Sequence, residues 1–317
     1  MFRNFRMLYD QTWPPKSKFS IDDIPDLTGK VVIVTGGYAG VGVETVYALL
    51  RKNAKVYIAA RNSAKAEKAI AELKEKTGHK AVEEFKSKET QLHILFNNGG
   101  VMAPPVDQLT ADGYDLQFGT NVLGKSISRS TIELLLPTLL ETVKSTPEKS
   151  VRVITTSSTG HLFYGPKMKW DLLKGDSPAR RKYGTQKLYL QSKYGNAVFA
   201  FELARRYGDQ GIISITLNPG NLKTELQRYV NKWQSAILFI SFTDMFCSAF
   251  IFQYWILVPA SKGALTQLWA GTMPETAEYN GKYLIPWARL GKASAESQDP
   301  ETGKQLWEWF EAQVKDV

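Results

Sequence analysis

The chain has 317 residues, of which 43 % are hydrophobic and 22 % are charged, a balance that excludes a disordered or low-complexity protein. Its net charge of +9 is spread along the sequence and accompanies no nucleic-acid-binding motif, so we expect no nucleic-acid partner. The single cysteine excludes an intrachain disulfide and is typical of an intracellular, cytoplasmic protein.

Short β-branched runs alternate with helical segments from residue 29 onward. The predicted strands cover residues 29–37, 55–61, 92–100, 151–158, 211–220 and 281–286. The predicted helices cover residues 43–54, 63–78, 131–144 and 189–208. Ser63 is the expected N-cap of the second helix and Gly78 its end. This alternation predicts an α/β fold with a doubly wound parallel sheet (Rossmann fold), in a single domain over residues 1–317.

Two segments fall outside this alternation. Residues 1–26 are predicted to form a loose N-terminal arm that could adhere weakly to a membrane surface. Residues 225–262 form a lid region that contains an apolar run over 236–258, long enough to span a bilayer. Asp244 near the centre of this run opposes insertion by about 2.5–3.5 kcal/mol. We therefore expect a lid or a buried segment, with membrane association through 236–258 as the alternative.

The turn TGGYAGVG, residues 35–42, follows the first strand and opens the first helix. Glycines in such a turn let the backbone approach a pyrophosphate, and the helix N-terminus stabilises its negative charge. We therefore predict a nucleotide-binding turn. Its expected cofactor contacts are Gly36, Tyr38, Gly40, Val41 and Gly42.

Further motifs follow in a fixed order: NNGG (97–100), TNVLG with Asn121, TTSSTG with Ser158, a Tyr-x-x-x-Lys pattern and PGNLKT (219–224). With the glycine turn, they resemble the short-chain dehydrogenase/reductase family over residues 27–220. Gly99 stands where the family's N-N-A-G turn has alanine. The stretches GYDLQFGTNVLG and NGKYLIPW are most similar to its retinol-dehydrogenase-like branch, particularly the fungal members.

The resemblance implies a nicotinamide-dependent oxidoreductase that interconverts a carbonyl and an alcohol on a lipophilic small molecule, in a family where homo-oligomers are common. It implies four catalytic residues, Asn121, Ser158, Tyr189 and Lys193. Ser158 would orient the carbonyl while Ser157 turns into the core, and Asn121 would hold a helix carbonyl and a water. The further cofactor contacts implied are Asn97, Gly99, Asn121, Tyr189, Lys193, Pro219, Gly220 and Thr224. For Asn121 and Thr224 a plain helix cap is the alternative.

The Tyr-x-x-x-Lys pattern occurs twice, at Tyr183 with Lys187 and at Tyr189 with Lys193. A neighbouring ammonium lowers the pKa of a phenol, so either pair could serve as an acid and base. Six residues rotate a helix by about 240°, so the two pairs cannot face one site. Gly184 and a cap at Thr185 would leave Tyr183 outside the helix, in a solvated loop pair with Lys187. We therefore assign the catalytic role to Tyr189 and Lys193.

The second strand ends in IAARN, without the acid that would bind the ribose 2′-hydroxyl of NAD. A guanidinium at Arg61 is well shaped for the 2′-phosphate of NADP, so we expect NADP rather than NAD. The alternative is that Arg61 is a surface residue. His79, His93 and His161 form no metal-binding pattern, and we expect no metal.

The interval between residues 60 and 92 is shorter than the family normally has. We therefore predict that its third strand is shortened or missing. If it is missing, a right-handed crossover would place the connecting helix on the opposite face of the sheet. A shortened sheet edge would also weaken adenine binding. The second hypothesis is therefore a catalytically impaired nucleotide-binding protein of the same fold.

Overall fold

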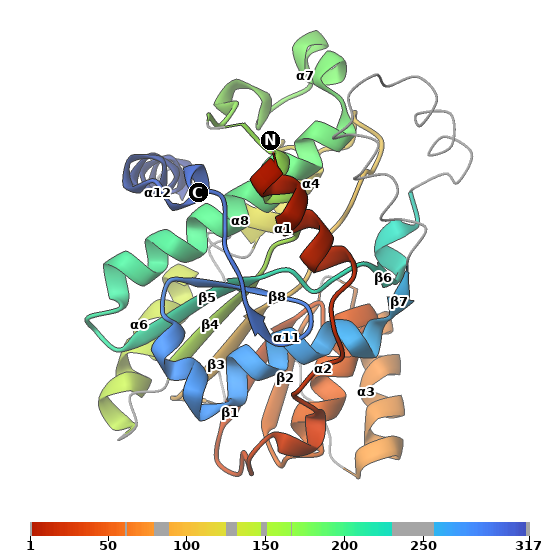
Figure 1. Cartoon of the computed structure of the whole chain (residues 1–317), viewed down its shortest axis with the longest axis vertical. Coiled ribbons are helices and arrows are strands. Elements are labelled where there is room, and N and C mark those ends of the chain that lie inside the picture. The colour runs from red at the N-terminus through yellow and green to blue at the C-terminus, as the bar shows by residue number, and fades with distance from the viewer. Residues whose placement is uncertain are drawn as a thin grey trace.

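The computed structural model describes residues 2–60, 62–78, 89–124, 132–146, 151–165, 167–229 and 257–314. Seven of its strands form one sheet in the order β2-β1-β3-β4-β5-β8-β9, in which only β9 runs antiparallel (Figure 1). The strands are β1 (Val31–Thr35), β2 (Lys55–Ala59), β3 (Ile94–Asn97), β4 (Val151–Thr156), β5 (Ile212–Leu217), β8 (Lys282–Ile285) and β9 (Arg289–Leu290). The predicted doubly wound parallel sheet is confirmed.

Helices cover both faces of this sheet. On one face α2 (Gly40–Leu50), α3 (Ser63–Thr77) and α11 (Ala260–Thr272) contribute to one buried apolar cluster. On the other face α6 (Ile132–Ser145), α8 (Thr185–Tyr207) and α12 (Pro300–Val314) contribute to a second cluster. Strand β1 divides its side chains between the clusters, with Val32 and Val34 in the first and Val31 and Ile33 in the second. This is the period-two alternation of a strand covered on both faces.

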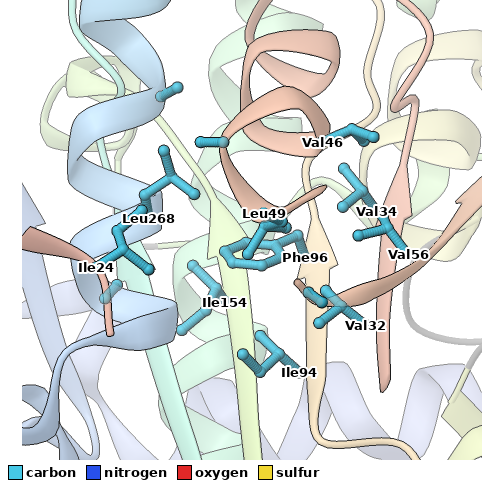
Figure 2. Close-up of a cluster of buried hydrophobic side chains, with 14 of the residues drawn as sticks. Ile24, Val32, Val34, Val46, Leu49, Val56, Ile94, Phe96, Ile154 and Leu268 are labelled. Atoms are coloured by element: carbon cyan, nitrogen blue, oxygen red, sulfur yellow. The ribbon is translucent and has the colours of Figure 1, made fainter. Parts of the chain in front are cut away.

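Figure 2 shows the centre of the first cluster, where Phe96 of β3 lies beside Leu49 of α2 and Ile154 of β4. All three side chains are buried. A Cβ at Gly271 of α11 would lie 2.4 Å from the Phe96 ring, so the glycine allows α11 to pack against that ring. Helix α11 therefore packs closely against Phe96 in the centre of the sheet.

The described residues contain no strand between β2 and β3, and β2 pairs only with β1. Residues 79–88 lie outside the described residues, so a shortened or missing third strand stays a prediction. The helix α3 does not lie on the opposite face that was expected for a missing strand. Ile70 and Leu73 of α3 join the cluster of α2 instead of the opposite one, because the apolar stripe of α3 is buried against that face. The predicted cap is also wrong by one residue, since Asn62 Oδ1 accepts the backbone N–H of Lys65 at 2.9 Å.

The N-terminal arm is packed, not loose. Helix α1 (Phe2–Thr12) buries Leu8 and Gln11, and Phe19 further along joins the first apolar cluster. The apolar run 236–258 lies almost wholly outside the described residues. Among the helices that the structure describes, none is long and apolar enough to cross a membrane.

Candidate active site

A cavity of about 750 Å³ opens at the carboxyl ends of β1, β3, β4 and β5. Its volume lies in the range of small-molecule and cofactor sites, and its position is the ligand-binding edge of open parallel sheets. Eleven of the predicted site residues line it: Gly36, Tyr38, Gly40, Val41, Gly99, Ser158, Tyr189, Lys193, Pro219, Gly220 and Thr224.

The glycine turn fits a nucleotide phosphate. Gly36 and Gly40 both have positive φ, and a Cβ at Gly36 would lie 2.8 Å from the Cα of Gly99. Helix α2 starts at Gly40 with Ala39 as N-cap, so no side chain caps its first turn, which faces the cavity. Gly42, also predicted as a cofactor contact, does not line the cavity. It is buried away from the cavity wall, where a Cβ would meet the carbonyl oxygen of Gly36 at 2.2 Å. Gly42 therefore allows the helix to pack against the turn.

The turn is joined to β3 by Thr35, which the sequence analysis did not single out. Its hydroxyl accepts the backbone N–H groups of Asn98 and Gly99, both at 3.0 Å. The predicted cofactor contact Asn97 is not brought to the cavity, because its side chain is fully buried and does not line the wall. Within the described residues the amide of Asn97 has no hydrogen-bond partner. Asn98 lines the cavity instead, and its Nδ2 donates to the Thr35 carbonyl at 3.1 Å.

The two serines directly after β4 both touch the cavity wall, but their hydroxyl groups have different partners. Ser158 lines the cavity and caps a short 3₁₀ helix (Thr159–Phe163), with its Oγ accepting the N–H of Gly160 at 2.8 Å. Ser157 turns into the core as predicted, and its Oγ donates to the backbone carbonyl of Lys193 at 2.7 Å. That bond joins the strand end to the helix that carries the Tyr–Lys pair.

Tyr189 and Lys193 lie on the first turns of α8, and both side chains reach the cavity wall. The Nζ of Lys193 lies 5.8 Å from the centre of the Tyr189 ring and donates to the Thr156 carbonyl at 3.3 Å. Burial lowers the pKa of Lys193 to about 8, so the ammonium is still the main form at neutral pH. The geometry thus places a cation beside a phenol at the edge of the cavity.

The second Tyr–Lys pair lies elsewhere, as predicted. Tyr183 ends the short helix α7 (Pro178–Tyr183), and Gly184 with φ of 86° separates it from α8. Tyr183 therefore belongs to a helix of its own instead of the expected loop, and Gly184 replaces Thr185 as the N-cap. Neither Tyr183 nor Lys187 lines the cavity.

Asn121 acts through the backbone and not at the cavity wall. It lies in a π-helical turn (Gly119–Leu123) and is fully buried. Its Oδ1 accepts the N–H of Val101 at 2.7 Å, and its Nδ2 donates to the Val101 carbonyl and to Ser192 Oγ, both at 2.9 Å. The expected bond to a helix carbonyl is therefore replaced by bonds to a loop and a side chain. A Cβ at Gly100 would lie 3.0 Å from Asn121 Oδ1 and 3.9 Å from Lys193 Nζ, so the glycine allows this close packing.

The far wall comes from the turn after β5, where Pro219 and Gly220 line the cavity. Thr224 also lines it and caps a 3₁₀ turn (Glu225–Gln227), with its Oγ1 accepting the N–H of Leu226 at 3.2 Å. The cap alternative for Thr224 is therefore confirmed.

At the end of β2 the cavity is lined by Ala59 and Ala60, and no acidic side chain is present there. Arg61 lies outside the described residues. In the described part of the chain no group of His, Cys, Asp and Glu is arranged to hold a metal ion.

The glycine turn suits a dinucleotide, and Tyr189 lies beside the cation of Lys193. Both features meet at the carboxyl edge of one parallel sheet. This combination is that of a Rossmann-fold oxidoreductase. Residues 30–168 match the family model described as short chain dehydrogenase. A short-chain dehydrogenase/reductase of Armillaria gallica is 53 % identical over 329 aligned positions, covering 98 % of each chain. Another from Phomopsis amygdali is 37 % identical, covering 99 % of this chain and 98 % of its own. This chain therefore belongs to the short-chain dehydrogenase/reductase family, whose members are oxidoreductases of CH–OH and carbonyl groups. Its retinol-dehydrogenase-like branch stays a prediction.

Solved structures agree on the fold. An uncharacterized protein from Mycobacterium paratuberculosis matches with a TM-score of 0.64 at 25 % identity, over 94 % of this chain and 98 % of that one. RhlG of Pseudomonas aeruginosa, solved as an NADP active-site complex, matches with a TM-score of 0.59 at 18 % identity, over 83 % of this chain and 96 % of its own. A 3-ketoacyl-(acyl-carrier-protein) reductase from Brucella melitensis, complexed with NADH, has a TM-score of 0.58 at 20 % identity, over 83 % and 98 % of the two chains.

Proposed function

We propose that this protein is an NADP-dependent oxidoreductase that interconverts a carbonyl and an alcohol on a lipophilic small molecule, with Tyr189 as proton donor and acceptor. The observation that carries the proposal is the meeting of Ser158 from β4 with Tyr189 and Lys193 from α8 on the wall of one cavity, beside the glycine turn.

The cofactor would be held by the residues that line the nucleotide side of this cavity. Gly36 and Gly40 leave room for the pyrophosphate at the start of α2. A nicotinamide cofactor supplies the hydride for reduction and accepts it in oxidation. The absence of an acid at Ala59 and Ala60, followed by Arg61, favours NADP over NAD.

In the direction of reduction, Tyr189 donates its phenolic proton to the carbonyl oxygen, and Ser158 orients that oxygen by a hydrogen bond. Lys193 remains mainly protonated at neutral pH, and its charge stabilises the phenolate that is left behind. In oxidation the same phenolate takes the proton from the alcohol.

The substrate end of the cavity supports a lipophilic molecule. The wall carries five apolar side chains, Met102, Leu109, Leu116, Leu226 and Leu257. Of these, Met102 and Leu226 belong to the apolar cluster that contains Tyr189. An apolar lining with a few placed polar groups is typical of sites that bind small apolar ligands. We also propose that the enzyme is intracellular and homo-oligomeric.

The decisive comparison is between Tyr189→Phe and Tyr183→Phe, because the two tyrosines share a sequence pattern but only one lies at the cavity. We expect Tyr189→Phe to lower carbonyl-dependent oxidation of NADPH by about 100-fold or more, the usual contribution of a general acid. Tyr183→Phe should retain wild-type turnover. Equal losses in the two variants would refute the assignment.

Cofactor choice is tested by fluorescence titration with NADPH and NADH. We expect tighter binding of NADPH, and we expect Arg61→Asp to reverse the preference because a carboxylate repels the 2′-phosphate. If neither cofactor binds the wild type, the second hypothesis, a protein of this fold without turnover, is favoured. Binding of both with equal affinity would contradict the role of Arg61.

A further inference from the structure

The N-terminal helix α1 reaches the wall of the cavity through the buried side-chain amide of Gln11. Gln11 is 3 % exposed, and its Oε1 accepts two hydrogen bonds, from Asn218 Nδ2 and from the Tyr283 hydroxyl, each at 3.0 Å. The partners lie more than 200 residues away in the sequence, on β8 and just after β5. Gln11 therefore joins the N-terminus to two strands of the sheet.

Asn218 is the first residue of the turn that forms the far wall of the cavity, and it lines the cavity itself. Its Oδ1 accepts the N–H of Gly220 at 3.1 Å, and its backbone N–H donates to the Leu284 carbonyl at 3.0 Å. Because Gln11 binds the other end of the amide, both polar atoms of the Asn218 side chain are fixed. Gln11 and Gly220 thus hold opposite ends of one side-chain amide at the start of the turn.

Tyr283, the second partner of Gln11, is connected through His161 to the backbone of Ser158. The ring of Tyr283 packs against the ring of His161, with 4.6 Å between their centres. His161 Nε2 accepts the N–H of Ser294 at 3.4 Å, so Nδ1 carries the proton and donates to the Ser158 carbonyl at 2.6 Å. Gln11 thus fixes one residue of the cavity wall directly and supports the ring that packs behind the backbone of Ser158.

Helix α1 is held in place independently of Gln11. Arg289 Nη2 donates to the Asp10 carbonyl at 2.7 Å, and Leu8 is buried. Thr12 Oγ1 donates within the helix, to the Leu8 carbonyl at 2.8 Å. A substitution that removes only the Gln11 amide therefore leaves other contacts to keep the helix on the sheet.

We propose that Gln11 is a positioning residue of the active site, which fixes the Asn218–Gly220 turn from the N-terminal helix. Its consequence for cofactor affinity rests on the proposed function, whereas its effect on the turn does not. The inference assigns residues 2–12 to the architecture of the site, although they lie outside the matched family region.

The test uses the full-length protein with Gln11→Leu, which keeps the side-chain size and removes the acceptor. Thr12→Val is the matched control, since it removes a buried hydrogen bond of the same helix without touching Asn218. Tyr283→Phe removes the hydrogen bond from Tyr283 to Gln11 and leaves the hydrogen bond between Asn218 and Gln11 in place. Amide hydrogen exchange is followed by mass spectrometry for peptides that cover residues 218–227, and the Kd for NADPH is measured in parallel.

We expect exchange in residues 218–227 to accelerate about fivefold in Gln11→Leu, the factor for loss of one neutral hydrogen bond, and to stay unchanged in Thr12→Val. The Kd for NADPH should rise by about the same factor in Gln11→Leu alone, and Tyr283→Phe should have the smaller effect on exchange. Unchanged exchange in Gln11→Leu, or equal acceleration in Thr12→Val, overturns the inference. A wild type that binds no nicotinamide cofactor refutes the proposed function, while the exchange result still decides the role of Gln11.

Discussion

His161 should make the stability of this protein fall between about pH 6.5 and pH 4. The imidazole is fully buried, and burial lowers the pKa of His161 from 6.5 to about 4, in spite of the bond to the Ser158 carbonyl. Protonation would also place a second N–H against the backbone N–H of Ser294, which now donates to Nε2. Between these pH values His161 therefore stays neutral in the native protein but is protonated in the unfolded chain.

The sign and size of this pH dependence follow from the linkage between proton binding and unfolding. Between pH 6.5 and pH 4 the unfolded chain binds more protons at His161 than the native protein, so the free energy of unfolding falls as the pH falls. A pKa that is lowered by about 2.5 units corresponds to about 3 kcal/mol, fully lost below pH 4. Above pH 6.5 this contribution no longer changes.

The contribution of His161 to the free energy of unfolding is measured by urea unfolding at a series of pH values, for the wild type and for His161→Asn. The amide of asparagine can donate to the Ser158 carbonyl in place of Nδ1 but does not titrate. The variant need not match the wild type in absolute stability, because the comparison is between slopes. We expect its free energy of unfolding to lose about 3 kcal/mol less than the wild type between pH 6.5 and pH 4. Parallel curves for the two proteins would refute the reasoning.

Two further predictions concern buried charges. Because burial lowers the pKa of Lys193 to about 8, kcat/KM for reduction should fall about tenfold per pH unit above that value, and a flat profile up to pH 9.5 would contradict the role of its ammonium. Arg180 and Asp115 form a buried ion pair at 2.8 Å, so Arg180→Met should lower the free energy of unfolding by about 3–5 kcal/mol, as measured in urea. Adding Asp115→Asn should recover most of this loss, since no uncompensated charge then remains; additive losses would show that the pair is not coupled.

The Tyr–Lys pair was predictable because the reasoning was local. Helix phase and the glycine directly after Tyr183 separated Tyr183 from Tyr189, and the structure has the break at Gly184 with a positive φ. The same holds for the glycine turn, where Gly36 and Gly40 are required by backbone geometry. Features set by a few neighbouring residues can be read from the sequence alone.

Asn97 shows where that reasoning was incomplete. The motif NNGG does not state which asparagine faces the ligand. Leu95 belongs to the second apolar cluster and Phe96 to the first, so both faces of β3 are buried and alternation does not select between the asparagines. The strand ends at Asn97, and Asn98 beyond it lines the cavity.

Gln11 and Asn121 could not be assigned locally. The bond partners of Gln11 lie 207 and 272 residues away, and Asn121 bonds to Ser192 across 71 residues. No hydrophobic period or turn motif encodes such pairs, because they depend on how the sheet brings distant segments together. For the same reason the packed state of the N-terminal helix was not predicted.

A shortened or missing third strand would affect the two ends of the site unequally. At the sheet edge, Tyr57 of β2 donates to Glu89, which also pairs with Lys55 of the same strand, so side-chain bonds fix the chain beside the edge strand. The residues proposed for catalysis lie on β4 and α8, on the other side of β1. The cost of a shortened interval would therefore fall on the adenosine half of the cofactor, and it should raise the Kd of the cofactor while leaving the chemical step at Tyr189 intact.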